Sequence, residues 1–516
     1  MTIITSFFRK ISMLLALFII FISVGFCYFY FENGKNNPVF SSDTKPDPRF
    51  ISIKNNQFIL DGKPWYLKAV NFVTTLRKND KEFWPSVFIG YIPEQEYYQT
   101  NKDSCLSELF HTFVLIHDLG YNSVRITGIG EYEIQNKHTG KVAFRADYFS
   151  TKDFRFQMDG DSVLNLYFSA IEDVLSCAQK AGLKVIFTLK VFPEAPITEW
   201  FLGKVAARFK DDPTILAYDF FNEPLYFDDK QRNKESIYTI TRRWNNIVKK
   251  NSPHQLTTIG LACQREVFEW DPNLVNVDFV SFHPYEYEKD QVRNEMYWYS
   301  KFVNKPWIIG ETGIPSNNDS IPYSDQAAFT KKTIEQNAKC GGMGYSWWQY
   351  KDVDWGDYHQ NYLGIVSRNG FTKNSLGRMI HGTPKPMNDV IKDFDPFQSK
   401  GKCFCPENYY NFSSNTYFKI IGRVVDESGN PIEGAGVLAW DEWWINHYFS
   451  TTKPDGTFEI YSDYDFYHWM ISPSNYEMIR ADVNLKNVKL VSGTRTIDLG
   501  TLKIKKIDLN SWRLNL

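Results

Sequence analysis

The stretch Ile215-Leu-Ala-Tyr-Asp-Phe-Phe-Asn-Glu223-Pro decides the fold, because it joins a buried strand to a turn that carries a carboxylate. A short, mostly apolar run that ends in turn residues is typical of a buried strand. The stretch Trp307-Ile-Ile-Gly-Glu311-Thr-Gly repeats this arrangement farther along the chain. We therefore expect two buried strands, each of which ends in a glutamate.

Six further apolar runs alternate with longer amphipathic or loop segments. This alternation is expected of parallel strands joined by helices, and eight such units close into a (β/α)8 TIM barrel. A hairpin is expected around 61–64, and a helix from Ala170 that ends at Gly182. The predicted strands are 66–72, 123–126, 184–189, 215–221, 257–261, 278–282, 307–310 and 344–348. We assign the barrel to residues 50–397 and expect its chemistry at the C-terminal ends of the strands.

The pattern changes after residue 397. Residues 398–417 are polar and are predicted to be a linker, and residues 418–516 contain strand-like runs separated by Gly, Asn and Asp turns, without a helical period. A small all-β sandwich domain is therefore expected. Its stretch from Gly422 to Val437, Gly-Arg-Val-Val-Asp-Glu-Ser-Gly-Asn-Pro-Ile-Glu-Gly-Ala-Gly-Val, resembles the carboxypeptidase regulatory-like domain.

The N-terminal segment, residues 1–32, is expected to be a transmembrane signal-anchor. Its run from Ile11 to Phe31 carries no charge, follows Arg9 and Lys10, and is about long enough to span a bilayer. Residues 33–49 are predicted to be a tether that holds the catalytic domain outside the cytoplasm. A cleaved signal, which would give a secreted protein, and a lipoprotein modified at Cys27 are the alternatives.

Composition excludes some partners. The formal net charge of −2 gives no attraction for nucleic acid, so a neutral ligand is favoured. Aromatic residues make up 17% of the chain, which suits ring stacking as well as a large core. The seven cysteines lack the spacing of a metal site, and no cofactor or metal is expected. A bridge between Cys403 and Cys405 would be strained, although either could pair elsewhere. Oligomeric state is left open.

The two glutamate motifs, Asn222-Glu223-Pro and Gly310-Glu311-Thr-Gly, resemble those of retaining (β/α)8 glycosidases, most closely glycoside hydrolase family 5, which contains cellulases and mannanases. The resemblance covers residues 50–397. It implies that Glu223 is the acid/base, that Asn222 is its sugar-binding neighbour and that Glu311 is the nucleophile. Two ordinary turns with solvated glutamates are the alternative reading of each motif taken singly.

Further residues match the same family. The resemblance implies that Arg125, His283, Tyr285 and Trp348 bind the substrate or support the carboxylates. Arg125 and Tyr285 are expected to hydrogen-bond the charged nucleophile, and Trp348 is expected to stack under the sugar before a cis peptide bond. His283 could equally be a structural histidine. If the inward face of the strand is miscounted by one residue, Trp347 takes the place of Trp348.

The function expected from these residues is retaining hydrolysis of a β-linked oligo- or polysaccharide, of β-mannan or β-glucan type, by double displacement. The family usually has a histidine near the end of strand three, where this chain reads Phe187-Thr-Leu-Lys-Val-Phe-Pro, which puts cellulose in doubt. A transglycosylase with the same carboxylates and a catalytically inactive, membrane-tethered carbohydrate-binding protein are the alternatives.

Overall fold

The computed structural model describes residues 47–514 apart from 80, 93–96, 130–131, 137–140, 147–153, 158–160, 194–195, 229, 400 and 411–415. The predicted anchor at 1–32 and most of the tether lie outside the described residues. Among the helices that are described, none combines the length and apolar character needed to cross a bilayer. One compact unit runs from Thr44 to Ile507, and only α12 (Leu509–Leu514) of the described elements lies outside it.

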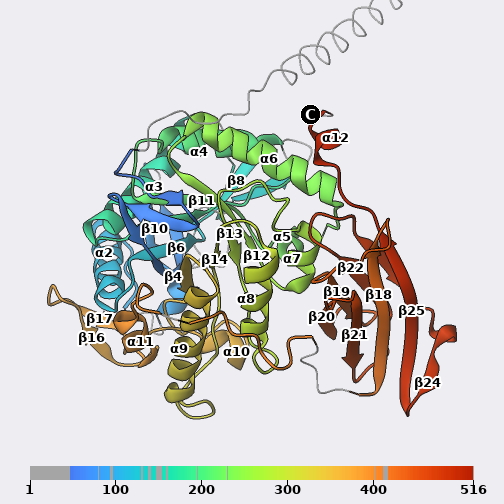
Figure 1. Ribbon diagram of the computed structural model, residues 1–516. Coiled ribbons are helices and arrows are strands. Elements are labelled where there is room, and N and C mark those ends of the chain that lie inside the picture. The colour runs from blue at the N-terminus through green and yellow to red at the C-terminus, as the bar shows by residue number, and fades with distance from the viewer. Residues whose placement is uncertain are drawn as a thin grey trace, which may run out of the picture. The chain divides into compact units, whose positions relative to one another are not determined.

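Eight parallel strands form a closed barrel, because the last strand pairs with the first. All eight predicted runs are strands of this barrel, so the predicted (β/α)8 architecture is confirmed (Figure 1). In the order of the chain they are β4 (Leu67–Lys78), β6 (Ser123–Thr127), β10 (Lys184–Thr188), β11 (Ile215–Asn222), β12 (Leu256–Leu261), β13 (Val280–Phe282), β14 (Trp307–Ile309) and β15 (Gly344–Trp347).

Helices surround the strands (Figure 1). The outward-facing apolar side chains of the strands pack against them in one large cluster, whereas inward-facing residues such as Ala69 and Ile308 fill the barrel. The predicted helix that ends at Gly182 is the second half of α3. The helices are α2 (Lys102–Asp118), α3 (Asp161–Lys180), α4 (Pro196–Arg208), α5 (Pro224–Asp228), α6 (Lys234–Asn251), α7 (Gln264–Trp270), α8 (Gln291–Phe302), α9 (Tyr323–Lys339), α10 (Tyr358–Asn361) and α11 (Met387–Asp393).

The predicted hairpin closes the base of the barrel. It is part of a three-stranded sheet of β1 (Ser52–Lys54), β2 (Gln57–Leu60) and β3 (Lys63–Trp65). Phe58 of β2 is fully buried and its ring lies 5.3 Å from that of Phe279. The hairpin thus seals the end of the barrel that does not carry the glutamates.

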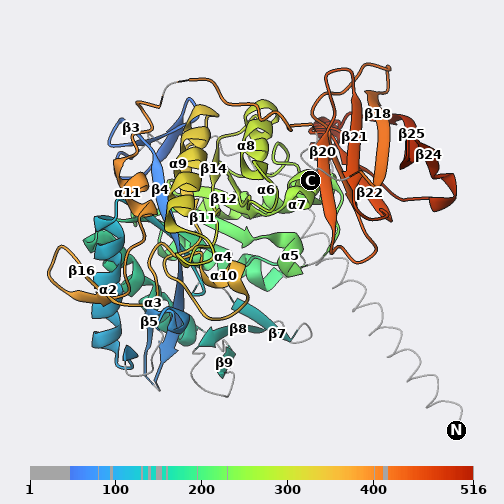
Figure 2. The ribbon, with the colours of Figure 1, turned by 90° about the horizontal axis from the view of Figure 1, so that it is seen from below.

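Several strands extend this plan and were not predicted. β5 (Phe83–Val87) pairs antiparallel with the long end of β4. A separate small sheet of β7 (Tyr132–Asn136), β8 (Lys141–Ala146) and β9 (Phe154–Gln157) follows β6 (Figure 2). A hairpin of β16 (Phe371–Lys373) and β17 (Met379–His381) follows β15.

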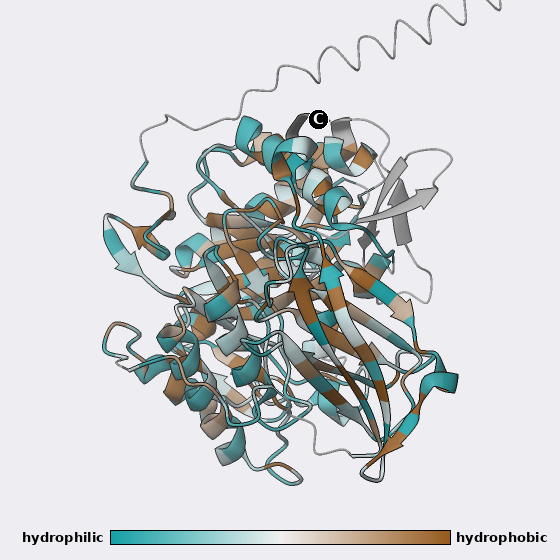
Figure 3. Cartoon of the chain, turned by 45° about the vertical axis from the view of Figure 1, so that its right-hand side comes forward, coloured by the Kyte–Doolittle hydropathy of each residue, from teal (hydrophilic) through white to brown (hydrophobic). Residues whose placement is uncertain are grey.

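The C-terminal region consists mainly of strands, as predicted, although α12 and a short 3-10 helix (Leu485–Asn487) also belong to it; its two four-stranded sheets enclose a second core. Figure 3 shows hydrophobic and hydrophilic residues alternating along these strands. One sheet consists of β21 (Thr457–Ser462), β18 (Phe418–Asp426), β25 (Thr494–Ile504) and β24 (Lys489–Val491); the other of β20 (His447–Thr451), β19 (Gly436–Trp440), β22 (His468–Ser472) and β23 (Ile479–Asp482). The resemblance to a carboxypeptidase regulatory-like domain is not confirmed, and the predicted domain boundaries stay predictions.

The sheet that contains β19 is buried on both faces. Val437 and Ala439 face the core of the sandwich, while Leu438 and Trp440 join the apolar cluster of the barrel. Polar contacts reinforce this packing. The buried Lys234 ammonium lies 2.9 Å from Asp271 and donates to the carbonyl of Pro473 at 2.7 Å. The Ser472 hydroxyl donates to Phe268 O at 2.6 Å, and Trp298 Nε1 donates to Gly434 O at 3.0 Å. The sandwich is therefore packed directly on α6, α7 and α8 of the barrel.

A disulfide joins Cys340, which follows α9, to Cys403, with the two Cα atoms 4.5 Å apart. Of the two pairings left open for Cys403, it is thus the distant one that forms. Cys403 lies in the segment after the barrel, so the bridge fastens this segment to the helical shell. The two cysteines are 63 positions apart in sequence.

Candidate active site

The C-terminal ends of β11 and β14 bring Glu223 and Glu311 together inside the barrel mouth. A carboxylate oxygen of each residue and a ring nitrogen of His283 all lie within 4.8 Å of one another. His283 Nδ1 is 3.0 Å from Glu223 Oε1 and 3.7 Å from Glu311 Oε1. The two glutamates that the sequence singled out therefore share one site.

The backbone at the end of β11 is irregular, and this aims Glu223. The register between β11 and β12 shifts between Asp219 and Asn222, as at a β-bulge. Glu223 itself has a φ of +52°, a left-handed conformation that non-glycine residues seldom adopt. Its N–H donates to Gly260 O at 3.0 Å, and α5 begins with Pro224 directly afterwards. Strained backbone that persists in this way is a recurrent feature of functional sites.

Arg125 of β6 organises the floor of the site. Its guanidinium is fully buried and reaches four side chains from three other strands or strand ends. Nε donates to Asp219 at 2.8 Å, Nη1 donates to Asn71 at 2.9 Å and to Glu311 Oε1 at 2.5 Å, and Nη2 donates to Asn222 Oδ1 at 2.7 Å. A planar guanidinium suits this role because its donors point in fixed directions.

Glu311 accepts a hydrogen bond on each of its oxygens. Arg125 binds Oε1, and the Tyr285 hydroxyl donates to Oε2 at 3.0 Å. Burial raises the pKa of Glu311, and these two donors act in the opposite direction because they bind the charged form. Of the two glutamates, Glu311 is thus the one built to stay ionised.

Glu223 has a different environment. Burial raises its pKa to about 7, Arg125 lowers it and the charge of Asp219 raises it. Its neighbour His283 is buried, which lowers the pKa of the imidazole to about 4, so the ring is neutral at pH 7. Glu223 therefore lacks the cationic donor that Glu311 has, and a proton shared by the pair is expected to reside on Glu223.

His283 is held by close packing as well as by hydrogen bonds. Ser281 Oγ lies 3.3 Å from Nε2, on the side of the ring away from Glu223. A Cβ at Gly310 would lie 1.7 Å from Ser281 Oγ and 2.9 Å from His283 Nε2. Glycine before Glu311 thus leaves room for the side chains of Ser281 and His283.

Trp347 and Trp348, at the end of β15, have different surroundings. Trp347 is fully buried, donates from Nε1 to Leu363 O at 2.6 Å and packs against Phe329 of α9. Trp348 is only partly buried, its N–H donates to Thr312 O at 2.9 Å, and the peptide bond that follows it is cis. Trp348 is therefore the more exposed of the two indoles, and its role as the sugar platform stays a prediction.

Three supporting residues were not predicted. Asp219 and Asn71 are fully buried partners of Arg125, and Asn71 Nδ2 also donates to Gly310 O at 2.9 Å. Glu266 of α7 accepts hydrogen bonds from the backbone of Leu225 and Ala262, and thereby ties down the loop after Glu223. In the sequence, Asp219 and Asn71 could have been noticed as a lone acid and a lone amide within predicted apolar strands.

Glu223, His283 and Glu311 also offer ligand types that suit a divalent cation. Arg125 is ion-paired to Glu311 and would place a fixed positive charge beside any such ion, which opposes its binding. The site fits carboxylate chemistry better than metal binding. The expectation that no metal is needed stays a prediction.

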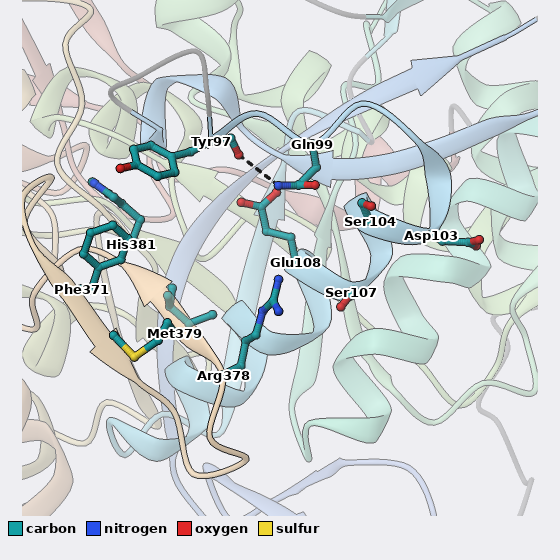
Figure 4. A pocket seen from close by; sticks show the side chains of 11 residues that line it. Tyr97, Gln99, Asp103, Ser104, Ser107, Glu108, Phe371, Arg378, Met379 and His381 are labelled. Carbon is teal, nitrogen blue, oxygen red and sulfur yellow. Dashed lines mark hydrogen bonds between the residues drawn. The ribbon is translucent and has the colours of Figure 1, made fainter.

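Two of the cavities that barrel residues line differ in their relation to the predicted site. One of about 550 Å³ is lined by Glu223, His283 and Tyr285 at one end. The second, of about 370 Å³, lies between α2 and the hairpin of β16 and β17, where Glu108 and Arg378 line it (Figure 4). None of the seven predicted site residues lines this second cavity, whereas three of them line the first.

Residues 108–351 match the family model described as Cellulase (glycosyl hydrolase family 5). These residues span the strands from β6 to β15 and include both glutamates. The match covers slightly less than half of the chain, and together with the closed eight-stranded barrel it supports a glycosidase-type barrel. No curated protein matches the chain.

Solved structures of glycosidases are also similar to this chain, at low sequence identity and low TM-score. A GH2 β-galacturonidase of Eisenbergiella tayi is 16% identical, with 69% of this chain and 55% of that chain covered and a TM-score of 0.42. A β-glucuronidase of Faecalibacterium prausnitzii is 13% identical (66% and 50% covered, TM-score 0.44), and a family 5 mannosidase of Rhizomucor miehei is 14% identical (67% and 96% covered, TM-score 0.43). The chain spans about half the length of the first two. Likenesses this weak carry no argument about substrate.

Proposed function

We propose that the protein is a retaining glycoside hydrolase that cleaves β-linked sugars by double displacement. The unequal environment of two adjacent carboxylates carries this proposal: Glu311 accepts from Arg125 and Tyr285, whereas Glu223 faces a neutral His283. Oxygen atoms within 4.8 Å fit the close pair of a retaining enzyme, whose carboxyl groups lie about 5 to 5.5 Å apart, rather than the wider pair of an inverting one.

In the first step, Glu311 attacks the anomeric carbon while Glu223 gives its proton to the departing oxygen. The glycosidic bond breaks, an ester to Glu311 forms, and Glu223 becomes a carboxylate. In the second step Glu223 takes a proton from water, whose oxygen attacks the anomeric carbon. The ester bond breaks, Glu311 leaves as a carboxylate, and the original configuration is restored. His283, held neutral, can donate from Nδ1 to the Glu223 carboxylate between these steps.

The substrate is a β-glucan or β-mannan oligo- or polysaccharide. The description of the matched family model favours the glucan. Asn222 keeps its amide oxygen on Arg125, so its Nδ2 group is the end that can donate to a sugar hydroxyl. Trp348, partly exposed beside Glu311, offers the stacking face for the sugar.

We propose further that the enzyme acts outside the cytoplasm, anchored by residues 1–32. The uncharged run from Ile11 to Phe31 supports an anchor. The disulfide between Cys340 and Cys403 supports an oxidising compartment, since such bonds are rare in the cytosol.

Azide rescue of Glu223→Ala tests the mechanism. Without its acid the variant should lose about 10²- to 10⁴-fold on substrates with a sugar leaving group, but much less in the first step on aryl glycosides, which depart unaided. Added azide should then speed release of the stalled intermediate and yield a glycosyl azide of unchanged anomeric configuration, as read by NMR. An inverted azide product would rule out double displacement at this site.

A further inference from the structure

The cavity beside Glu223 has a wall that comes from the C-terminal sandwich. Trp444 and His447 line it together with Glu223 and with Arg265 of α7. Trp444 lies in the loop between β19 and β20, more than two hundred positions after the acid/base residue. The sandwich therefore reaches the catalytic cleft in addition to packing on the barrel.

The assignment of this cavity to one side of the cleaved bond follows from the proposed mechanism, on which the inference rests. Glu223 must face the glycosidic oxygen, whereas Glu311 must face the anomeric carbon. Glu223 lines the cavity, but neither Glu311 nor Trp348 does, among the residues that the structure describes. The cavity thus extends from the site on the side of the leaving group.

The loop that carries Trp444 is ordered by local hydrogen bonds. Asp441 Oδ1 accepts from the N–H groups of Trp443 and Ile445 at 3.1 and 2.9 Å, and its Oδ2 accepts from Asn446 N at 2.8 Å. Within it, Trp444 adopts a φ of +63°, in the left-handed region. A turn held this way presents Trp444 at a fixed position while Trp443 stays 74% exposed.

Trp444 holds Arg265 in the cavity. The Trp444 ring stacks on His447 at 4.8 Å with an interplanar angle of 9°, and the Arg265 guanidinium lies over the ring 4.5 Å from its centroid. In the described part of the chain Arg265 forms no ion pair, and its buried Nε has no hydrogen-bond partner. A guanidinium fixed by an aromatic ring keeps its donors directed at a ligand.

The other charged groups of this cavity are already engaged. Glu266 accepts from two backbone N–H groups, and Glu295 accepts from Tyr299 at 2.7 Å and from Gln291 at 3.2 Å. Two strongly exposed rings, Tyr226 at 76% and Tyr287 at 78%, line the same space. Donors beside exposed aromatic rings are what a neutral sugar needs, because it presents hydroxyls at its edge and an apolar face.

We propose that the sandwich completes a binding site for the leaving-group sugar. In this site Arg265 donates to sugar oxygens, and Trp444 is a positioning residue that acts through Arg265. The ligand class is a neutral saccharide, so the enzyme prefers an oligosaccharide to a glycoside with a small aryl leaving group.

The test compares two leaving groups on one glycone. Trp444→Ala and Arg265→Gln are assayed on cello- and manno-oligosaccharides of three to six units and on the matching 4-nitrophenyl β-glycosides. We expect kcat/KM on the oligosaccharides to fall about 10- to 100-fold, as for a lost hydrogen bond to a charged donor, and kcat/KM on the nitrophenyl glycosides to change less than about threefold. Trp444→Phe should recover most of the loss.

Trp443→Ala is the matched control, because it removes the neighbouring indole, which does not line the cavity. The ratio of the two substrates does not depend on how much enzyme is folded, so it separates binding from stability. Equal losses on both substrate classes, or no loss on either, would overturn the inference while leaving the glycosidase proposal intact. No turnover of any β-glycoside by the unaltered enzyme would overturn both.

Discussion

The ends of β11 and β14 carry the same side chain in opposite surroundings. After β14, Glu311 has two donors, one of them the buried Arg125. At β11, Glu223 follows a register shift, has a left-handed backbone and faces a neutral imidazole. Because the residue type is the same, the difference expected between the two pKa values comes from the neighbouring groups.

Replacing Glu311 should give the largest effect. Glu311→Ala removes the group that forms the covalent bond, so kcat should fall by more than about 10⁴-fold on sugar and aryl leaving groups alike. Steady-state assays on both substrate classes measure it. Glu235→Ala, an exposed glutamate of α6, is the control and should keep full activity. A variant that kept its rate on aryl glycosides would exchange the roles of the two glutamates.

Removing a hydrogen-bond donor from Glu311 should have an effect of intermediate size and sharpen the comparison. Tyr285→Phe deletes the hydroxyl that binds Oε2, so the charged form of Glu311 is less stable and its pKa rises further. The acidic limb of kcat/KM, which reports ionisation of the nucleophile, should move to higher pH, and kcat/KM should fall about 10- to 100-fold.

The alkaline limb of the same pH profile should not move, because it reports Glu223, whose pKa lies near 7. Tyr464→Phe, an exposed tyrosine of the sandwich, is the control and should leave the profile unchanged. A shift of the alkaline limb alone would mean that Tyr285 acts on Glu223 instead.

The barrel could be predicted from sequence because its signals are local. Each strand is a short apolar run that ends in turn residues, and the two glutamates stand directly after such runs. The alternation of side chains along the run 344–348 predicts Trp348 over Trp347 as the sugar platform, and that choice stays a prediction.

The rest depended on long-range partners that a pattern does not name. The sequence pattern shows Asp219 only as one residue of a strand and does not indicate its hydrogen bond with Arg125. The apolar run of β19 was predicted as a strand, but nothing in it showed that its second face would pack on the barrel. The pairing of Cys403 with Cys340 likewise required the fold, since seven cysteines allow many pairs.

The smallest effect of the series is on stability, and neutralising Glu223 should reveal it. Burial raises the pKa of Glu223 to about 7 from an ordinary value of 4.5, so the folded protein binds a proton that the unfolded chain releases between these values. That contribution to stability is fully present below pH 4.5 and is lost as the pH rises through 7. Glu223→Gln cannot lose it.

The variant should therefore match the unaltered protein near pH 4.5 and exceed its free energy of unfolding at pH 8 by about 1 to 3 kcal/mol, since each pKa unit is worth about 1.4 kcal/mol. The lower end is expected because the Glu223 side chain keeps 16% exposure, through which water screens the charge. Urea unfolding at the two pH values measures the difference, with Glu235→Gln as the exposed control. If the two proteins kept a constant difference across this range, Glu223 would be ionised throughout, and the contrast between the two strand ends would fail.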